Sequence, residues 1–294
     1  MELRHLRYFV ILAEELHFAR AAERLAISPP TLTVQIQEIE RTLSAQLLKR
    51  TKRSVALTSA GEVFLVEARR VLQQFATAEN VGRRAGRGEL GRVEIGYVGS
   101  AAYTGLLQAQ MSQFSGDYPD VHVNAREFEM EKLPKLIADG EVDIGFVRLP
   151  MTLPASLEHH VLIRDHFCLA RPAAQTDSPE EAVAPADLAA AAFVLPEQAF
   201  GTFQVASLGG FTPRIVSRPG SLLAVLTQVS IGRGVAVIPS TLRAVVTLPA
   251  VAFHTLSGEP IISEIAALFR SDENAPTARN FITQLRKLET RSVS

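Results

Sequence analysis

Apolar residues recur at helical spacing in successive stretches near the start of the chain. A first helix is predicted because one of its faces would gather Leu6, Phe9, Val10, Ala13 and Leu16. A second, shorter helix from Phe18 to Leu25 has a face of small residues that allows close packing. These stretches predict a small helical head.

A third helix is predicted after Ser28, a favourable N-cap that precedes Pro29. Its buried stripe consists of Leu32, Ile36, Ile39 and Leu43. The outer face and its flanks carry Pro30, Thr31, Thr33, Val34, Gln35, Gln37, Glu38 and Arg41. Hydroxyls and amides at the N-terminal end of a helix braced by a second helix suit the DNA major groove. An ordinary helical hairpin in a core is the alternative.

The pattern then shifts towards a period of two between Leu47 and Thr58, with four cations among residues 49–53. We predict a β-wing with a basic tip. A solvated run of charge is the alternative, but the position directly after a helix-turn-helix pattern favours phosphate contacts. Residues 1–88 hold 14 Lys and Arg against 9 Asp and Glu, or +5, and the remainder holds 16 against 22, or −6. The basic charge is therefore concentrated in the head.

The head resembles the winged helix-turn-helix of the LysR-type transcriptional regulators. The resemblance lies in the runs at residues 6–9, 21–25, 32–36, 47–51 and 57–61 and their spacing. It implies DNA contacts from the hairpin at residues 18–37 and from the wing, with Pro30, Thr31 and Thr33 near bases and Arg50 and Arg53 near the backbone. The full candidate set is Phe18, Arg20, Ser28, Pro30, Thr31, Thr33, Val34, Gln35, Gln37, Arg50 and Arg53. Pro29 and Val34 replace the Gln and Arg common in the family, which leaves the base sequence open.

Residues 59–91 are predicted to form a linker helix and a hinge, between a DNA-binding domain at 1–58 and an effector domain at 92–294. Ser59 and Glu62 have capping-box spacing, and the helix is expected to run to about Arg84. A coiled-coil seam is predicted at Phe64, Ala68, Val71, Phe75, Ala78 and Gly82. Packing of this helix on its own effector domain is the alternative to a dimer. The resemblance implies dimers through the linker helix and their pairing into tetramers.

The effector domain alternates apolar strands with helical segments, which predicts parallel sheets with helices on both faces. Strands are expected at 93–98, 121–125, 143–147, 167–170, 192–195, 214–217, 235–238 and 264–270. Helices are expected at 106–118, 131–139, 221–231 and 277–288. The pattern indicates two lobes with a cleft between them, like a periplasmic solute-binding protein. Lobe I is predicted at about 92–163 and 269–294, and lobe II at about 164–268. The predicted class is thus α/β with a winged helix-turn-helix head.

The cleft is expected at the loops after the strand ends. Segments 99–102 and 200–203 offer backbone N–H groups and a hydroxyl, and Arg148 could add a positive charge. Helix capping by Ser100 and Thr202, and a surface ion pair of Arg148, are the alternatives. The candidate set is Ser100, Ala101, Phe128, Met130, Arg148, Gly201, Thr202 and Phe203. Parts of it resemble family members that control aromatic-compound catabolism, which implies an anionic effector such as an aromatic or unsaturated carboxylate. Met130, where those members carry a hydroxyl, implies a less polar end.

Other classes of protein have weaker support. An enzyme acting on a small anion in the cleft would lack a Gly-x-Ser-x-Gly elbow, and His159 and His160 lack metal-ligand spacing. Cys168, the only cysteine, lies in an apolar strand and excludes an intramolecular disulfide or a two-cysteine switch. A transported-solute binder would need a signal peptide, which the charged start does not resemble. We therefore expect a cytoplasmic regulator with no cofactor or metal and no membrane segment.

Overall fold

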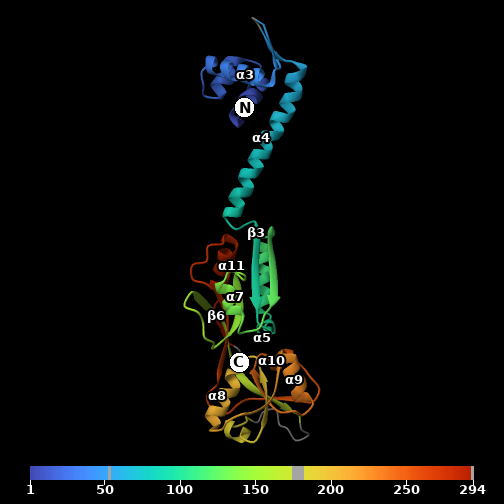
Figure 1. The fold of residues 1–294 in the computed structure, drawn as a ribbon, viewed down its shortest axis with the longest axis vertical. Coiled ribbons are helices and arrows are strands. Elements are labelled where there is room, and N and C mark those ends of the chain that lie inside the picture. Colours follow the sequence, from blue (N-terminus) through green and yellow to red (C-terminus); the bar gives the residue numbers. More distant parts are fainter. Residues whose placement is uncertain (52–53, 174–181, 293–294) are drawn as a thin grey trace. The chain divides into compact units, whose positions relative to one another are not determined.

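The computed structural model describes residues 1–51, 54–173 and 182–292. The chain divides into two compact units, residues 1–84 and 85–294, and each is described by itself (Figure 1).

The first unit is a winged helix-turn-helix. Its elements are α1 (Leu3–Glu15), α2 (Phe18–Arg24), α3 (Pro29–Leu43), β1 (Leu48–Arg50), β2 (Val55–Leu57) and most of α4 (Ser59–Gly86). The predicted stripes meet in one core, where Phe9, Leu12, Leu32 and Ile36 are fully buried. Strands β1 and β2 pair antiparallel as the predicted wing, whose candidate Arg53 lies outside the described residues.

Helix α4 begins where predicted, but its N-cap differs from the prediction. The hydroxyl of Thr58, not Ser59, accepts the backbone N–H of Gly61 at 2.9 Å. Thr58 also donates to the carbonyl of Gln46 at 2.7 Å. This one residue therefore links the start of α4 to the segment that leads into β1 of the wing.

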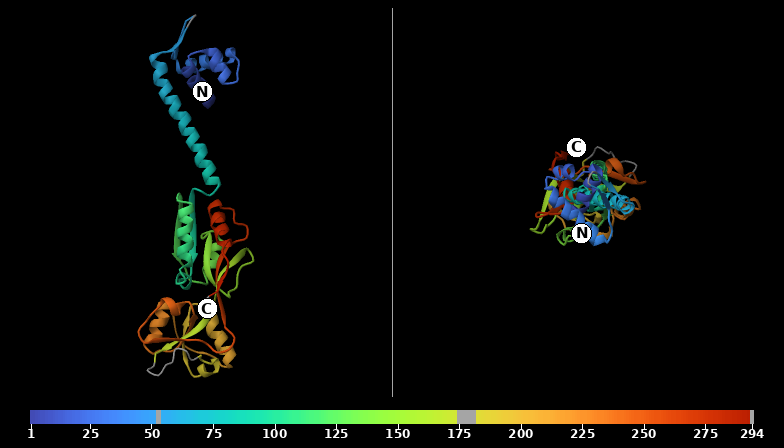
Figure 2. Two further views of the ribbon diagram at one scale, coloured as in Figure 1. Left: turned by 180° about the vertical axis from the view of Figure 1, so that it is seen from behind. Right: turned by 90° about the horizontal axis from the view of Figure 1, so that it is seen from above.

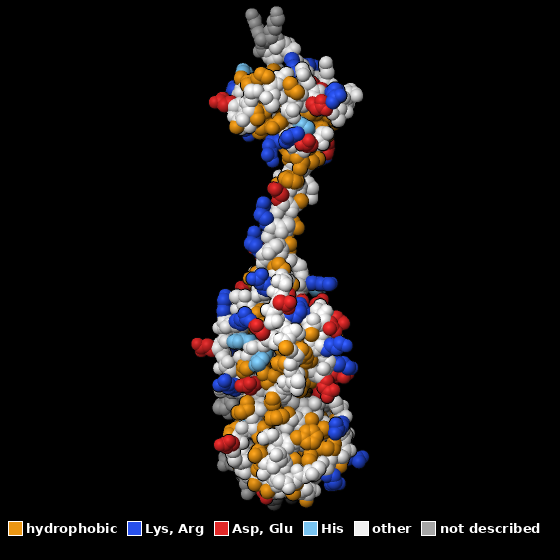
Figure 3. Space-filling view, turned by 60° about the vertical axis from the view of Figure 1, so that its left-hand side comes forward, with side chains coloured by type: hydrophobic (Ala, Val, Ile, Leu, Met, Phe, Trp, Pro, Cys, Tyr) orange, Lys and Arg blue, Asp and Glu red, His pale blue; other side chains and the backbone are white. Residues whose placement is uncertain are grey.

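The predicted seam of α4 is divided between two surroundings. Phe64 packs against Phe9 with ring centroids 5.1 Å apart, and Ala68 is 1% exposed in the core of its own unit. Two of the six predicted seam residues, Phe64 and Ala68, are therefore packed within their own unit. Val71, Phe75, Ala78 and Gly82 are exposed, and Figure 3 shows apolar side chains along this helix.

The second unit contains an eight-stranded sheet that continues through two lobes, and a separate two-stranded sheet. Its strands are β3 (Gly91–Tyr97), β4 (Val121–Glu127), β5 (Ile144–Leu149), β6 (Leu157–Pro172), β7 (Ala192–Pro196), β8 (Arg214–Gly220), β9 (Ala236–Pro239), β10 (Val251–His254), β11 (Ile262–Arg270) and β12 (Arg291–Ser292). Its helices are α5 (Gly99–Ala102), α6 (Leu106–Asp117), α7 (Leu133–Ala138), the short 3-10 helix at Pro185–Leu188, α8 (Phe200–Gly209), α9 (Leu222–Ser230), α10 (Leu242–Val245) and α11 (Pro276–Arg286).

Strand β6 connects the lobes. Its first part pairs with β11 in lobe I, and its second part pairs with β9 and β10 in lobe II. In the left view of Figure 2, which is seen from behind, β6 and β11 run from one lobe to the other. The expected parallel sheets are only partly observed. β3 is parallel to β4 and β5, and β7 to β8, but β11 is antiparallel to β5 and β6, and β6 is antiparallel to β9 and β10. β11 pairs with β5 of lobe I from Glu264 to Phe269.

Two glycines let α7 approach the lobe I sheet closely. Gly96 and Gly145 are neighbours across β3 and β5. A Cβ at Gly96 would come within 2.4 Å of Leu133, and one at Gly145 within 2.5 Å of Ile137. The helix can therefore lie against the backbone of the strands. In the part of the chain that the structure describes, no helix is long and apolar enough to cross a bilayer.

Candidate DNA-binding surface and effector cleft

The N-terminal end of α3 presents an exposed polar face. Ser28 caps the helix by accepting the Thr31 N–H at 3.3 Å, and the Thr33 hydroxyl donates to the carbonyl of Pro29 at 2.9 Å. Val34 is 58% exposed. The other candidates on this surface are also exposed or partly exposed: Phe18, Arg20, Pro30, Thr31, Gln35 and Gln37. The geometry leaves hydroxyls, an amide and one apolar side chain facing outward, as a major-groove reader requires.

Glu40 holds the wing against α3. One carboxylate oxygen accepts the backbone N–H groups of Leu47 and Leu48 at 2.9 and 3.1 Å, and the other accepts Arg50 at 2.7 Å. The guanidinium of Arg50 also lies 5.2 Å from the ring centroid of Phe18. Arg50, predicted as a phosphate contact, is thus also a structural link between the wing and the helices.

The cleft between the lobes lies at the ends of strands from both. Its inner part is lined by residues that follow β3, β4, β7, β8 and β9: Val98, Gly99, Ser100, Glu127, Met130, Pro196, Glu197, Gln198, Gly220, Ser221, Leu222 and Pro239. The free volume there is about 30 Å³, room for about one water molecule. An adjoining outer part of about 710 Å³ shares Glu127, Pro196, Glu197, Gly220 and Ser221 with it.

The predicted effector residues are only partly brought together. Ser100 and Met130 line the inner cleft and Phe128 lines the outer part. Ala101 is buried beneath and lines neither part. The prediction for lobe II is wrong: Gly201 packs on the ring of Phe167, Thr202 is fully buried, and Phe203 is 48% exposed elsewhere on α8.

Arg148 does not offer its charge to the cleft. It is fully buried and pairs with Asp165, also fully buried, at 3.1 Å. It donates to the hydroxyl of Ser263 at 3.0 Å and to the carbonyl of Ser100 at 3.4 Å. The correction has a physical reason, since a buried guanidinium requires a counter-charge, and β6 supplies it.

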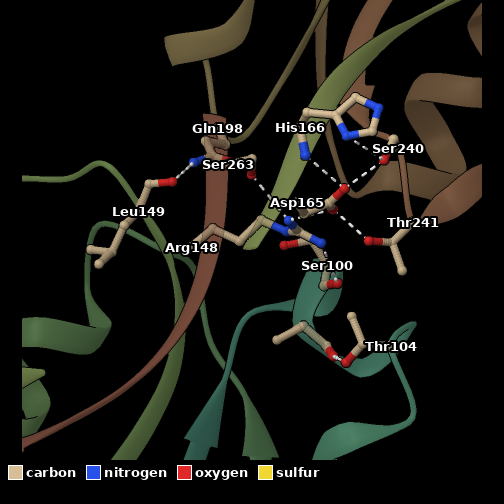
Figure 4. A network of polar contacts seen from close by, with 11 residues as sticks. Ser100, Thr104, Arg148, Leu149, Asp165, His166, Gln198, Ser240, Thr241 and Ser263 are labelled. Carbon is tan, nitrogen blue, oxygen red and sulfur yellow. Dashed lines mark hydrogen bonds and ion pairs between the residues drawn. The ribbon is translucent and has the colours of Figure 1, made fainter. Parts of the chain in front are cut away.

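Asp165 joins the two lobes through this pair (Figure 4). Ser240 and Thr241 of lobe II donate hydroxyl hydrogen bonds to its carboxylate, the first at 2.6 Å. Burial acts to raise the pKa of Asp165, but those hydroxyls, Arg148 and the backbone N–H of His166 together hold it below its ordinary value. Burial lowers the pKa of Arg148, opposed by the charge of Asp165. The network therefore links the two lobes where β6 passes from one to the other.

The polar lining of the cleft consists largely of acceptors. The carboxylate of Glu197 in lobe II accepts the backbone N–H of Met130 in lobe I. Burial raises the pKa of Glu197, and the charges of Glu129, Glu127 and Glu131 add to this effect. The amide of Gln198 donates to the carbonyl of Leu149 at 3.4 Å, while its own oxygen is buried with no partner among the described residues.

Donors enter the cleft from the N-terminus of α9. Ser221 caps this helix by accepting the Ala224 N–H at 3.3 Å, and the first turn of a helix leaves backbone N–H groups without helical acceptors. Ser221, Glu197 and Gln198 also line the cleft, although they were not predicted as cleft residues from the sequence. The signal was available, because Ser221 opens the clearest predicted helix of lobe II directly after a strand.

A second hollow of about 540 Å³ lies outside this cleft, lined mainly by apolar residues including Leu149, Met151, Phe200, Leu208 and Ile262. Among the described residues that line it there is no Ser or Thr hydroxyl. The cleft between the lobes is therefore the better candidate for a small polar ligand.

A winged helix-turn-helix joined to a two-lobed binding domain defines a ligand-responsive class of DNA-binding regulators. Comparison with known proteins identifies the family. Residues 3–62 match the family model "Bacterial regulatory helix-turn-helix protein, lysR family", and residues 86–289 match "LysR substrate binding domain". The chain belongs to the LysR family of transcriptional regulators.

Relatives and solved structures agree over nearly the whole length. The chain is 36% identical over 288 residues to the uncharacterized HTH-type transcriptional regulator YnfL of Escherichia coli K12, covering 96% of each. It is 33% identical to the regulator AlsR of Bacillus subtilis 168, covering 96% of this chain and 94% of that one. The structure of full-length CbnR complexed with its target DNA superposes with a TM-score of 0.78 at 27% identity, covering 98% and 99%.

These relatives are named as transcriptional regulators, not enzymes. The chain is thus a regulator with a DNA-binding head, and its substrate-binding domain implies that an effector binds to it. Full-length BenM is a more distant structural neighbour, with a TM-score of 0.57 at 25% identity.

Proposed function

We propose that the protein controls transcription by reading a promoter with the exposed N-terminal face of α3, under control of a small effector held in the cleft between its lobes. The observation that carries the DNA-reading part is the outward set of Thr31, Thr33, Val34 and Gln37 beside a basic wing. The structure of CbnR bound to its target DNA, which matches 98% of this chain, supports it.

A matched pair of threonines on α3 tests this surface. Thr33 and Thr42 each donate a hydroxyl to the carbonyl four residues earlier, at 2.9 and 2.8 Å, but only Thr33 lies at the N-terminal end. Selection from random duplexes with Thr33→Val should yield an altered consensus, and Thr42→Val should yield the parental one. An unchanged consensus for Thr33→Val would remove this residue from base recognition.

The assembly unit is proposed to be a dimer through the exposed half of α4, with dimers pairing into a tetramer. Val71 is 46% exposed and Phe75 39%, and a partner helix would cover this apolar surface. Phe75→Glu should reduce the mass seen by light scattering, since a charge would enter the seam. Exposed Thr77, whose hydroxyl donates within the helix, provides the control as Thr77→Glu. Equal masses for both variants would contradict this seam.

The effector is proposed to carry a carboxylate bound at the N-terminus of α9. Ser221, Ser100 and the first-turn N–H groups of α9 would donate hydrogen bonds to this carboxylate. Arg148 would not contact it, because Arg148 is paired with Asp165. Phe128 and Met130 supply apolar contacts. Because the inner cleft holds only about 30 Å³, the ligand must separate the lobes there, and this movement links binding to regulation.

A thermal-shift comparison tests the carboxylate. Ligands that bind only the folded protein raise its Tm, and acids should do so more than the matching neutral amides. Ser221→Ala should weaken binding of the acid. Without ligand, the variant should lose only the stability that a helix cap contributes, about 1 kcal/mol. Equal shifts from acids and amides would contradict a carboxylate site.

A further inference from the structure

The acceptors of the cleft are not explained by a simple carboxylate effector. Glu127 and Glu197 line the inner part, and no Lys or Arg among the described residues lines it. In the outer part, Glu129 and Glu131 join them, and two cations also line it: Lys132, which is paired with Glu129 at 2.7 Å, and Arg218. Glu127 and Glu197 thus form an acidic wall of the cleft, and a ligand with only negative charge would meet like charge there.

A separate observation indicates that the wall receives a hydrogen-bond donor. Gln198 is 7% exposed and lines the inner cleft, and its amide oxygen has no partner among the described residues. The orientation of the amide is fixed, since the carbonyl of Leu149 can only accept and therefore faces the NH₂ group. A buried acceptor without a donor is costly, and a ligand N–H group would satisfy it.

A metal ion is a poor occupant for this wall. Among the described residues, no three His, Cys, Asp or Glu side chains are grouped so that they could hold one. An organic ammonium group needs only two or three acceptors around its N–H bonds.

We propose that the effector is an α-amino acid with an apolar side chain, whose ammonium group is bound by Glu197, Glu127 and the amide oxygen of Gln198. Its carboxylate lies at Ser221 and the N-terminus of α9, and its side chain contacts Val98, Leu222 and Pro239, which line the same inner cleft. Glu197 reaches across the lobes to the N–H of Met130. The ammonium group therefore competes with that backbone N–H for the carboxylate and loosens a contact that holds the lobes together.

This inference rests on the proposed function in taking the cleft as the effector site. Its test measures ligand binding by the full-length protein without DNA. A failure here therefore leaves the DNA-reading tests unaffected, and a failure of those tests leaves this one standing.

The experiment compares each amino acid with the acid and the amine derived from it. Calorimetry and thermal shift would use L-leucine, L-methionine and L-phenylalanine, then 4-methylpentanoate and 3-phenylpropanoate, then 3-methylbutylamine and 2-phenylethylamine. At least one amino acid should bind, and at least about tenfold more tightly than its acid or amine, because a hydrogen bond to a charged group is lost in each.

Two variants locate the ammonium site. Glu197→Gln keeps the shape and the acceptor for Met130 and should weaken the amino acid at least about tenfold without weakening the acid. Glu141→Gln makes the same charge change at an exposed residue outside the cleft and should bind like the parent. The proposal is overturned if none of the three amino acids binds, or if an acid binds as tightly as its amino acid. It is also overturned if Glu197→Gln, shown folded by circular dichroism, binds the amino acid like the parent.

Discussion

Asp165→Asn should be among the most destabilising single changes in the effector unit. The variant keeps the shape of the side chain but removes the charge that compensates Arg148, and both side chains are 0% exposed. Breaking a buried ion pair by removing one partner costs about 3–5 kcal/mol. In a unit of this size, about 2–4 °C of Tm is lost per kcal/mol, so the apparent Tm should fall by roughly 6–20 °C.

A neighbouring ion pair on the same two strands provides the control. Arg164 and Glu264 pair at 3.2 Å across β6 and β11, but Arg164 is 65% exposed. Glu264→Gln should cost no more than about 1 kcal/mol, because exposed pairs contribute little. The double variant Asp165→Asn with Arg148→Met should recover most of the loss, since no uncompensated charge remains.

Scanning calorimetry of the full-length variants would measure these differences. The reasoning would be refuted if Asp165→Asn and Glu264→Gln lowered the Tm equally, or if the double variant were less stable than Asp165→Asn alone. Either result would mean that the charge of Arg148 is not compensated by Asp165.

Three further predictions concern the wing, the lobe I sheet and the cleft. Glu40→Ala should lower the free energy of unfolding by about 1–3 kcal/mol, because the N–H groups of Leu47 and Leu48 lose their acceptor. Chemical denaturation would measure this loss, and a change below about 0.5 kcal/mol, typical of ordinary surface substitutions, would contradict the prediction. Gly145→Ala should destabilise by about 1–3 kcal/mol through overlap with Ile137, whereas Gly116→Ala, in open space on α6, should be neutral or stabilising; equal effects would contradict the close packing of α7. The raised pKa of Glu197 means that its ionisation disfavours the folded state as pH rises through that pKa. Glu197→Gln should therefore raise the ligand-free Tm at pH 7 but not below the unfolded pKa of about 4.3, and a gain that persisted at pH 3.5 would argue against this cause.

The helical head could be predicted in detail because each of its helices is amphipathic on its own. Leu32, Ile36 and Ile39 are buried as their spacing indicates, and Ser28 caps α3 as its position before Pro29 suggests. Local pattern and local packing agree there, so little depends on distant contacts.

The junction between the two lobes could not be predicted in the same way. Strand β6 runs from Leu157 to Pro172, but it was expected only at residues 167–170. The prediction was too short because Arg164 and Asp165 interrupt the apolar pattern. Asp165 is buried because Arg148, on another strand, neutralises it, and nothing in the spacing of the two residues reveals that pairing. For the same reason Arg148 was taken as a ligand-binding charge.

Three of the eight candidate effector residues, Ser100, Phe128 and Met130, line the cleft between the lobes. Ser100 follows from the rule that ligands bind at strand ends, whereas Met130 came from the family resemblance. In lobe II the same rule was applied at residues 200–203, although β7 ends at Pro196 and Glu197 and Gln198 follow it directly. The exact end of a strand thus decided which side chains face the ligand.

Coupling between the cleft and the DNA-binding surface is the central claim, and one titration tests it most directly. Fluorescence anisotropy would measure the affinity of the full-length protein for a duplex obtained by selection, with and without the compound of the amino acid and acid panel that gives the largest rise in Tm. We expect the Kd for DNA to change by at least about fivefold at saturation, the lower range of ordinary allosteric coupling, and expect no change when the unselected duplex is used. An identical Kd for the selected duplex with and without saturating compound would contradict the account.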